Sequence, residues 1–466
     1  MDPIRTDIAY QECINVGCRR RFDVGEPLFA CTACGDLLDV RYDWSHAVLP
    51  KRLEEFEAKW SVPGDPLTFS GVWQYHELFP FAPPQNVVTV GEGKTVFQQA
   101  DRVAPFARMN VGRLFLQYEG MNPSGSFKDN GMTAAFTHAR LVGAGRAVCA
   151  STGNTSASVA MYAAVDGRIP AIVLVGSGKI AYGKLAQALD YGVRVVEVEG
   201  DFDTCMRRVK QVASELGIYL MNSLNPFRLE GQKTIMYRVI EGLLWDVPEW
   251  VVVPGGNLGN SSAFGKAFKE LYDVGLISRI PRLAVIVADG ADTLYRIVND
   301  EGLAWNGGRV DDGRIAAFYE DMDAEDRRAR TVASAIEINR PVNLKKCLRS
   351  LEWTDGLVEK VSDQEILDAK AHIGAGGFGC EPASAATVAG VRKLREADVI
   401  GPDDRVACVL TGHPLKDPNI TVTYHTLEEA AIREKYEGYT LYGAPYANRP
   451  IPVPDDLDAI VDALRS

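Results

Sequence analysis

Lys128 is the residue of this chain whose chemistry says most about function. It follows a loop rich in Gly, Ser and Pro, residues 119–127, and stands where that loop is expected to pass into a helix. A lysine amine is a weak nucleophile while it is protonated, and it condenses with a carbonyl as a Schiff base once its surroundings lower its pKa. A lysine near the start of a helix is more often a solvated surface residue. Lys128 therefore marks a site only if other segments can hold a cofactor beside it.

Three further Gly-rich segments supply such partners, and each follows an apolar run: residues 151–157, 254–260 and 411–417. Glycines let backbone N–H groups converge on an anion, and the N-terminus of a following helix adds partial positive charge. The segment 254–260 is neither G-x-G-x-x-G nor a Walker loop, so it gives little support to a dinucleotide or to ATP. A Gly-rich turn is often only a tight corner. Two turns that each open a helix after an expected strand nevertheless favour one phosphate-bearing cofactor.

Four of the nine cysteines lie close together near the N-terminus: Cys13, Cys18, Cys31 and Cys34. Thiolates held by two tight turns can close a tetrahedral Zn²⁺ site, and Gly35 follows the second pair where such a turn needs it. The first pair is separated by four residues instead of the usual two, which leaves open a site without metal, with four free thiols. Four cysteine ligands leave no position for a substrate water, so zinc here is expected to be structural.

Composition argues against several classes of function. The chain has 466 residues, 46% hydrophobic and 24% charged, as in a soluble protein of two or three domains with a sizeable core. The net charge of −12 argues against binding to nucleic acid or to an anionic membrane. No apolar run reaches the roughly 20 residues of a membrane span, and the first seven residues do not resemble the start of a signal peptide. We therefore expect a cytoplasmic location.

Beyond Lys128, apolar runs typical of strands alternate with helical patterns, which predicts a doubly wound α/β body with a parallel sheet. Such sheets bind ligands in the crevice beyond the carboxyl ends of their strands, where all four Gly-rich segments are expected to lie. Residues 300–345 show little periodicity. The predicted strands are 113–118, 147–150, 171–175, 193–198, 218–220, 250–253 and 283–287, and the predicted helices are 154–165, 181–189, 204–216, 230–244 and 260–271.

The segments at both ends of the chain are expected to pack on this body. We predict a zinc-ribbon-like segment over residues 1–45, an aromatic-rich arm over 46–85, and a catalytic region over 86–427 whose smaller lobe spans roughly 125–235. A C-terminal extension, 428–466, is expected to be peripheral, with a Pro-rich spacer before one short helix.

These motifs carry a family resemblance that covers roughly residues 70–420. The four Gly-rich segments resemble those of fold type II pyridoxal-phosphate enzymes: Asn-Pro-Ser-Gly-Ser-Phe-Lys-Asp (122–129), Ser-Thr-Gly-Asn-Thr-Ser (151–156), Gly-Gly-Asn-Leu-Gly (255–259) and Thr-Gly-His-Pro-Leu-Lys (411–416). Residues 70–73 and 222–234 resemble segments of threonine synthase in particular. Two positions depart from the family pattern, Asn130 where Arg is frequent and Pro414 where Gly is frequent. The resemblance implies two doubly wound α/β lobes with pyridoxal 5′-phosphate between them.

The resemblance also implies a role for each motif residue. Lys128 is the lysine that carries the cofactor, Asn154 hydrogen-bonds its ring hydroxyl, and Thr411 approaches its pyridine nitrogen with a neutral hydroxyl. The cofactor's phosphate is expected in the turn formed by Gly255, Gly256, Asn257, Leu258 and Gly259. The substrate carries its own phosphate, which an Arg fork can hold through two hydrogen bonds. The residues expected at that phosphate are Asn222, Ser223 and Arg228, with Ser151 and Thr155 nearby.

The implied activity is that of a threonine synthase, which converts O-phospho-L-homoserine and water to L-threonine and phosphate. Lys128 would serve as both anchor and base, while phosphate leaves from Cγ and water adds at Cβ. The expected partners are this small substrate and a second copy of the chain in a homodimer, with neither nucleic acid nor membrane.

Alternatives remain open in the same enzyme class and outside it. A serine/threonine dehydratase or a phosphoamino-acid β-replacement enzyme could share the fold, but a dehydratase would need no second phosphate site. A cofactor-binding relative without turnover is disfavoured because Lys128 and Arg228 are both present. A zinc-ribbon scaffold protein is a further alternative, although the net charge argues against a role on nucleic acid.

Overall fold

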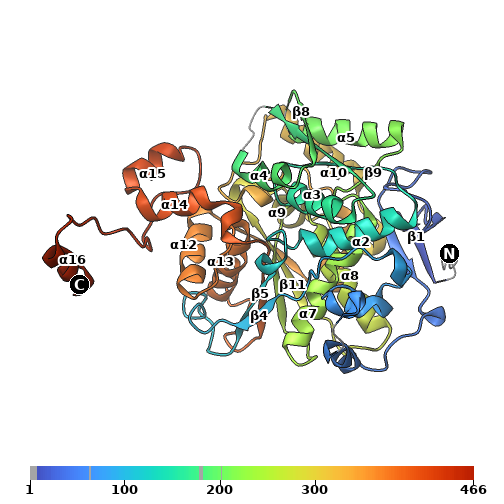
Figure 1. Cartoon of the computed structure of the whole chain (residues 1–466), viewed down its shortest axis with the longest axis horizontal. Helices are drawn as coiled ribbons and strands as arrows, with labels where there is room; N and C mark the ends of the chain where they lie inside the picture. Colours follow the sequence, from blue (N-terminus) through green and yellow to red (C-terminus); the bar gives the residue numbers. More distant parts are fainter. Residues whose placement is uncertain (1–7, 62–63, 178–181, 201, 466) are drawn as a thin grey trace.

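The larger lobe is built on a six-stranded sheet in the order β12-β11-β10-β13-β5-β4; Figure 1 labels β4, β5 and β11 of this sheet. The computed structural model describes residues 8–61, 64–177, 182–200 and 202–465. All neighbouring strands of this sheet are parallel except β4 and β5 at one edge. The strands are β4 (Val96–Gln99), β5 (Leu114–Tyr118), β10 (Trp250–Pro254), β11 (Arg282–Ala288), β12 (Leu357–Val361) and β13 (Val406–Leu410).

Helices cover both faces of this sheet, which explains why its central strands read as continuous apolar runs. Val251 and Val253 face one core beneath α8 and α11, whereas Val252 faces a second core beneath α12 and α13. The helices of this lobe are α7 (Thr234–Gly242), α8 (Gly259–Asp273), α9 (Thr293–Tyr295), α10 (Asp312–Ala324), α11 (Leu344–Trp353), α12 (Asp363–Ala375), α13 (Pro382–Glu396) and α14 (Pro418–Thr426).

The smaller lobe contains a four-stranded parallel sheet in the order β8-β7-β6-β9. Its strands are β6 (Ala147–Ala150), β7 (Ala171–Gly176), β8 (Arg194–Val198) and β9 (Tyr219–Leu220). Its helices are α2 (Lys128–Leu141), α3 (Asn154–Asp166), α4 (Tyr182–Asp190), α5 (Phe202–Leu216) and α6 (Pro226–Gln232). Two α/β lobes with parallel sheets confirm the predicted fold class.

The structure corrects one predicted helix and adds another where none was predicted. The single helix predicted over 230–244 is wrong, because α6 and α7 are separate helices that meet at Lys233. The region 300–345, which shows little periodicity, contains α10, whose N-cap Asp311 accepts a hydrogen bond from Arg314 N. The predicted start of a helix at residue 181 lies outside the described residues.

A small antiparallel sheet forms the N-terminal ribbon, in the order β2-β1-β3. Its strands are β1 (Ala9–Cys13), β2 (Arg21–Asp23) and β3 (Leu38–Tyr42). The following arm, with α1 (Pro66–Phe69), buries Trp73, Tyr75 and Phe79 against the body.

Buried charges join β3 to three helices of the body. Asp39 pairs with Arg349 of α11 at 2.8 Å, and that guanidinium, together with Lys266 and Lys346, holds the pKa of Asp39 well below its usual range although burial opposes this. Lys266 of α8 pairs with Glu230 of α6, and Glu230 also accepts a hydrogen bond from Tyr42 Oη of β3 at 2.7 Å. Lys266 and Lys346 also donate hydrogen bonds to carbonyl oxygens within β3. The strand is thus bonded to helices whose other ends approach the main cavity.

The C-terminal extension has two unlike parts. Helix α15 (Glu429–Lys435) buries Ile432 in a small apolar cluster with Tyr424 and Leu441, so this part belongs to the body. Beyond residue 448 the chain is largely exposed and ends in α16 (Leu457–Arg465), which projects away from the rest of the molecule (Figure 1). Among the described residues, no helix combines the length and apolarity needed to cross a membrane.

Candidate active site

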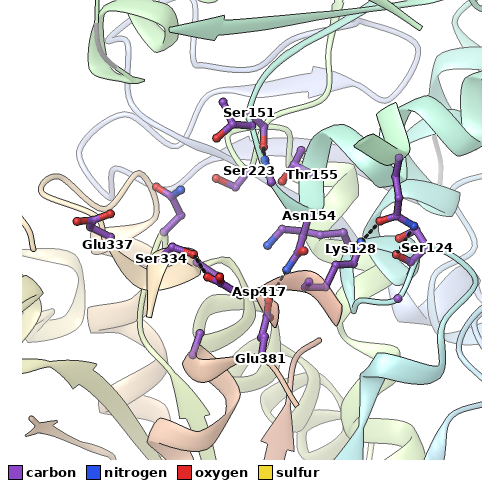
Figure 2. Close-up of a pocket in the computed structure, with 18 of the residues that line it drawn as sticks. Ser124, Lys128, Ser151, Asn154, Thr155, Ser223, Ser334, Glu337, Glu381 and Asp417 are labelled. Atoms are coloured by element: carbon purple, nitrogen blue, oxygen red, sulfur yellow. Dashed lines mark hydrogen bonds between the residues drawn. The ribbon is translucent and has the colours of Figure 1, made fainter. Parts of the chain in front are cut away.

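A cavity of about 1150 Å³ lies where the strands of both lobes end (Figure 2). The segments that follow β5, β6, β7, β10 and β13 all contribute to its wall, as expected for ligand sites of open parallel sheets. The predicted residues on this wall are Lys128, Ser151, Asn154, Thr155, Asn222, Ser223, Arg228 and Asn257. The other predicted cofactor residues, Gly255, Gly256, Leu258, Gly259 and Thr411, do not line the cavity but are buried beside residues that do.

The loop before Lys128 is fixed at both ends. Asp129 accepts hydrogen bonds from Ser124 N at 2.7 Å and Ser124 Oγ at 2.6 Å, which folds the loop back onto the start of α2. Phe127 N donates to Thr411 O at 3.0 Å, and Ser126 forms a bridge with Gly412. These bonds tie the lysine loop to the end of β13, so the two motifs lie side by side.

The amine of Lys128 is poised to lose its proton. Burial lowers the pKa of Lys128 to about 7, with a smaller contribution from the nearby positive charge of Arg228. In the described part of the chain, no hydrogen bond or ion pair engages the Lys128 amine, which lies 3.8 Å from the centroid of the Phe127 ring. A lysine that is neutral for much of the time near pH 7 can act as a nucleophile and as a base.

Glu381 joins two of the predicted cofactor residues and was not expected from the sequence. Its carboxylate accepts hydrogen bonds from Asn154 Nδ2 at 2.8 Å and from Thr411 Oγ1 at 2.9 Å. Figure 2 shows the side chains of Lys128, Asn154 and Glu381 converging at the middle of the cavity. The signal for a helix start was present, because Pro382 follows Glu381 at the first position of α13, but nothing in that pattern indicates a site.

The turn after β10 offers backbone donors to an anion. Gly255 N donates to Ile286 O at 2.6 Å, so this N–H is not available to a ligand. The N–H groups of residues 256–259 have no protein acceptor among the described residues, as is usual before and at a helix N-terminus. Leu258 has φ +62, a conformation that non-Gly residues rarely adopt and that is often found at functional sites.

The turn is also packed too closely for side chains at its glycines. A Cβ on Gly255 would lie 2.8 Å from Val287 Cγ1, and one on Gly256 would lie 3.1 Å from Ala335 O. The backbone of this turn is therefore held by its packing, and its free N–H groups are fixed before any ligand binds.

Arg228 is a buried cation with unused hydrogen-bonding capacity. It is 2% exposed, its Nη1 donates to Met221 O at 2.8 Å, and its buried Nε has no partner. Burial lowers the pKa of Arg228 to about 10, which leaves the guanidinium charged at neutral pH. A buried charge with an unsatisfied N–H on the wall of a cavity points to an anionic ligand.

Asn222 and Ser223, which line the cavity with Arg228, differ in the hydrogen bonds that they make. The Asn222 side chain both accepts from Ala150 N and donates to Ala150 O, each at 2.9 Å, so it mainly holds the end of β6. Its second N–H faces Met206 Sδ at 3.3 Å and could be redirected to a ligand. Asn343, a second residue missed from the sequence, donates from Nδ2 to Ser223 O at 3.0 Å and to Asn257 O at 3.3 Å, which joins the two segments that were predicted to bind phosphate.

His413 and the two positions that depart from the family pattern have structural roles. His413 lines the cavity, but its Nδ1 accepts from Leu415 N at 3.2 Å, as a helix cap. Asn130 is buried and bonds to Asn122 and Thr234. Pro414 packs against Gly379.

The four N-terminal cysteines form a compact cluster. Their sulfur atoms all lie within 4.8 Å of one another, with Cys13 Sγ 3.4 Å from Cys34 Sγ and Cys18 Sγ 3.7 Å from Cys31 Sγ. The longer spacing of the first pair does not prevent a turn, because Asn15 O accepts hydrogen bonds from Cys18 N and from Arg19 N. The donor set and its size fit a tetrahedral metal site.

The residues of the main cavity also fit pyridoxal 5′-phosphate. Lys128 supplies an unpaired amine, and residues 256–259 supply free backbone donors for one phosphate. The cavity volume is ample for the cofactor together with an amino-acid substrate.

Comparisons with known proteins agree with this fit. Residues 88–412 match a family model described as "Pyridoxal-phosphate dependent enzyme". A threonine synthase from Methanocaldococcus jannaschii is 40% identical over 417 residues, which cover 88% of this chain and 94% of that protein. "Threonine synthase 2, chloroplastic" from Arabidopsis thaliana is 34% identical over 448 residues, 92% of this chain and 80% of that protein.

Among solved structures, threonine synthase from Escherichia coli is similar in fold, with a TM-score of 0.61 over 98% of this chain and 99% of that chain, at 18% identity. Its low identity supports the fold alone, whereas the two sequence relatives cover most of both chains at 34–40% identity. The chain therefore belongs to the threonine synthase family of pyridoxal-phosphate-dependent enzymes.

Proposed function

We propose that this chain converts O-phospho-L-homoserine and water to L-threonine and phosphate. The observation that carries the proposal is that two separate places for an anion lie at the cavity, one on its wall and one directly beside it. One is Arg228 with its unpaired Nε, and the other is the turn 256–259 with its free N–H groups. A cofactor phosphate and a substrate phosphate need both, whereas a dehydratase needs only one.

The cofactor contacts follow from this division. The N–H groups of Gly256, Asn257, Leu258 and Gly259 hold its phosphate, and Gly255 shapes the turn. Asn154 donates to its ring hydroxyl, Thr411 contacts its pyridine nitrogen, and Lys128 forms the covalent link. When bound there, pyridoxal 5′-phosphate withdraws electrons from the attached amino acid and makes its Cα–H and Cβ–H bonds acidic.

Lys128 moves the protons in this proposal. Its amine, with a pKa of about 7, is basic enough to accept a proton from Cα and acidic enough to return one. Burial supplies most of this tuning, so the same desolvation that frees the amine also keeps bulk water from the reacting carbons.

Arg228 orients the substrate by its phosphate and stabilises that group as it leaves from Cγ. Ser223 and the second N–H of Asn222 complete the phosphate site, and Ser151 and Thr155 lie on the same wall. A fixed guanidinium favours loss of phosphate over loss of a smaller group, because only phosphate satisfies its fork.

We further propose one structural Zn²⁺ on Cys13, Cys18, Cys31 and Cys34. Support comes from the closeness of the four sulfur atoms and from Cys31: burial acts to raise the pKa of this thiol, but hydrogen bonds from the backbone of Ala33 and Cys34 and the neighbouring thiols lower it to about 7. A metal here would lie in the ribbon, apart from the main cavity.

A homodimer and a cytoplasmic location are also proposed. The exposed apolar side chains of α16, Leu457 and Leu464, support a second copy as a partner. Sedimentation of the purified protein tests the oligomeric state.

The activity is tested by supplying the purified holoenzyme with phosphohomoserine, serine or threonine. We expect threonine and inorganic phosphate in equal amounts from phosphohomoserine, and little ammonia from serine or threonine. Faster consumption of serine or threonine than of phosphohomoserine would assign the chain to the dehydratases instead.

A further inference from the structure

A second, smaller cavity adjoins the main one between the two lobes. Its volume is about 230 Å³, and α5 of the smaller lobe forms one side while the segment 322–340 of the larger lobe forms the other. Arg328 lines both cavities, so they meet at its side chain. The lining residues are Thr204, Arg207, Met322, Asp323, Arg327, Arg328, Asn339 and Arg340. Four guanidinium groups thus face one carboxylate, in a chain whose net charge is −12.

We call this second cavity the arginine pocket. The carboxylates around it in the described part of the chain do not neutralise all four of its guanidinium groups. Asp323 pairs with Arg340 at 2.5 Å and lies 3.8 Å from Arg328. Arg328 also pairs with Asp326 at 3.0 Å, and Arg327 pairs with Glu325.

Arg207 differs from the other three arginines. It donates to Thr204 Oγ1 at 3.3 Å, and no carboxylate in the described part of the chain forms an ion pair with it. Among the residues that the structure describes, no acid thus matches the charge of at least one guanidinium in the pocket.

We propose that the arginine pocket is a second phosphate-binding site at the mouth of the active site. The proposal rests on the proposed function, in which both the substrate and one product carry phosphate. The guanidinium fork pairs with two phosphate oxygens at once, and several forks can share one dianion. The volume is below the roughly 300–1,000 Å³ of pockets for whole cofactors, which suits a phosphate group with some water.

The position of the pocket beside the main cavity indicates what it does for the reaction. A phosphorylated amino acid is an anion that approaches a protein of the same overall sign, so a local positive field at the mouth of the cavity raises the rate of productive encounters. Inorganic phosphate is released in the main cavity, which this pocket adjoins at Arg328. Because Arg207 comes from the smaller lobe and the other three arginines from the larger lobe, a phosphate held here also draws the lobes together.

Binding of inorganic phosphate to the holoenzyme tests the site directly. Calorimetric titration should show two classes of site in the wild type, one of which Arg228→Ala removes. Arg207→Gln should weaken the other by about three- to tenfold, the range for one exposed charged contact.

Arg208→Gln is the matched control. Arg208 lies on the same helix and bonds to Gln211 Oε1 at 3.0 Å, outside the pocket. Its variant should bind phosphate as the wild type does. A single class of phosphate site in the wild type would overturn the proposal. So would an equal affinity for phosphate in Arg207→Gln and Arg208→Gln.

Kinetics then distinguish the two sources of phosphate. If the pocket receives the incoming substrate, Arg207→Gln lowers kcat/KM for phosphohomoserine, leaves kcat unchanged and makes kcat/KM less sensitive to salt. If it receives the product, kcat/KM is unchanged and the inhibition constant for inorganic phosphate rises. No change in either quantity contradicts the inference. A wild type that does not consume phosphohomoserine refutes the proposed function instead, while the titration still reports on the pocket.

Discussion

Replacement of Arg228 is the sharpest test of whether the substrate phosphate and the cofactor phosphate bind at separate sites. Arg228→Ala removes from the cavity wall a buried guanidinium that has one protein acceptor, Met221 O, and an unpaired Nε. Loss of charge-assisted hydrogen bonds to a phosphate costs about 2–3 kcal/mol, which corresponds to roughly 30- to 150-fold in kcat/KM. The cofactor's phosphate is proposed to lie in the separate turn 256–259, so cofactor content and its absorbance should stay unchanged.

The assay compares kcat/KM for phosphohomoserine with the cofactor absorbance and the unfolding temperature of each variant. Arg228→Lys keeps the charge but loses the fork, so its kcat/KM should fall between those of the wild type and Arg228→Ala. Arg140→Ala is the control for losing a partly buried arginine, because Arg140 pairs with Asp166 away from the cavity. It should lower stability without changing kcat/KM. An Arg228→Ala enzyme with unchanged kcat/KM, or one that loses its cofactor, would refute the assignment of the two sites.

Three further predictions concern the lysine, its pKa and the cysteines. Lys128→Ala should abolish the absorbance near ~410–430 nm that a lysine-linked cofactor gives, and turnover should fall by several orders of magnitude; a comparable rate would show that Lys128 is not the base. The rate at which the apoprotein covalently captures pyridoxal 5′-phosphate should rise with pH and level off above about 7, because only the neutral amine reacts and the pKa of Lys128 is lowered to about 7 by burial; a rise that continues to pH 10 would contradict this. The protein should contain about one Zn²⁺ per chain by elemental analysis, and removal of the metal should lower the unfolding temperature, whereas metal-free protein of equal stability would exclude a structural site.

The elements that the sequence predicted well are those whose local pattern agrees with their environment. The strands expected at 147–150 and 250–253 match β6 and most of β10, because both lie in the interior of parallel sheets where every position favours apolar residues. The break between α6 and α7 was missed, although Asn225 and Pro226 form a recognisable helix start. At the junction Lys233 is buried between Glu230 and Glu270, and contacts of that kind leave no periodic signal.

The same distinction between local patterns and long-range contacts applies to the residues of the candidate site. Its motif residues could be predicted because they sit in short Gly-rich segments directly after strands, and the crevice rule places such segments together. Glu381 and Asn343 could not, because their importance comes from hydrogen bonds to residues between 30 and 227 positions away in the chain. Gly255 was predicted, but the hydrogen bond that its N–H donates to Ile286 O was not, because only the strand order reveals that pairing.

The attachment of β3 has a consequence for where the smallest active chain can begin. A shortened chain that starts after Tyr42 would retain every proposed cofactor and substrate contact. It would nevertheless leave Lys346 without Asp39 and Leu38 O, and Arg349 without Asp39, whereas Lys266 would keep its pair with Glu230. Stranding buried cations costs several kcal/mol, comparable with the whole stability of a typical domain. The ribbon is therefore an integral wall of the enzyme's core, and a catalytic fragment cut at the apparent domain boundary should fail to fold.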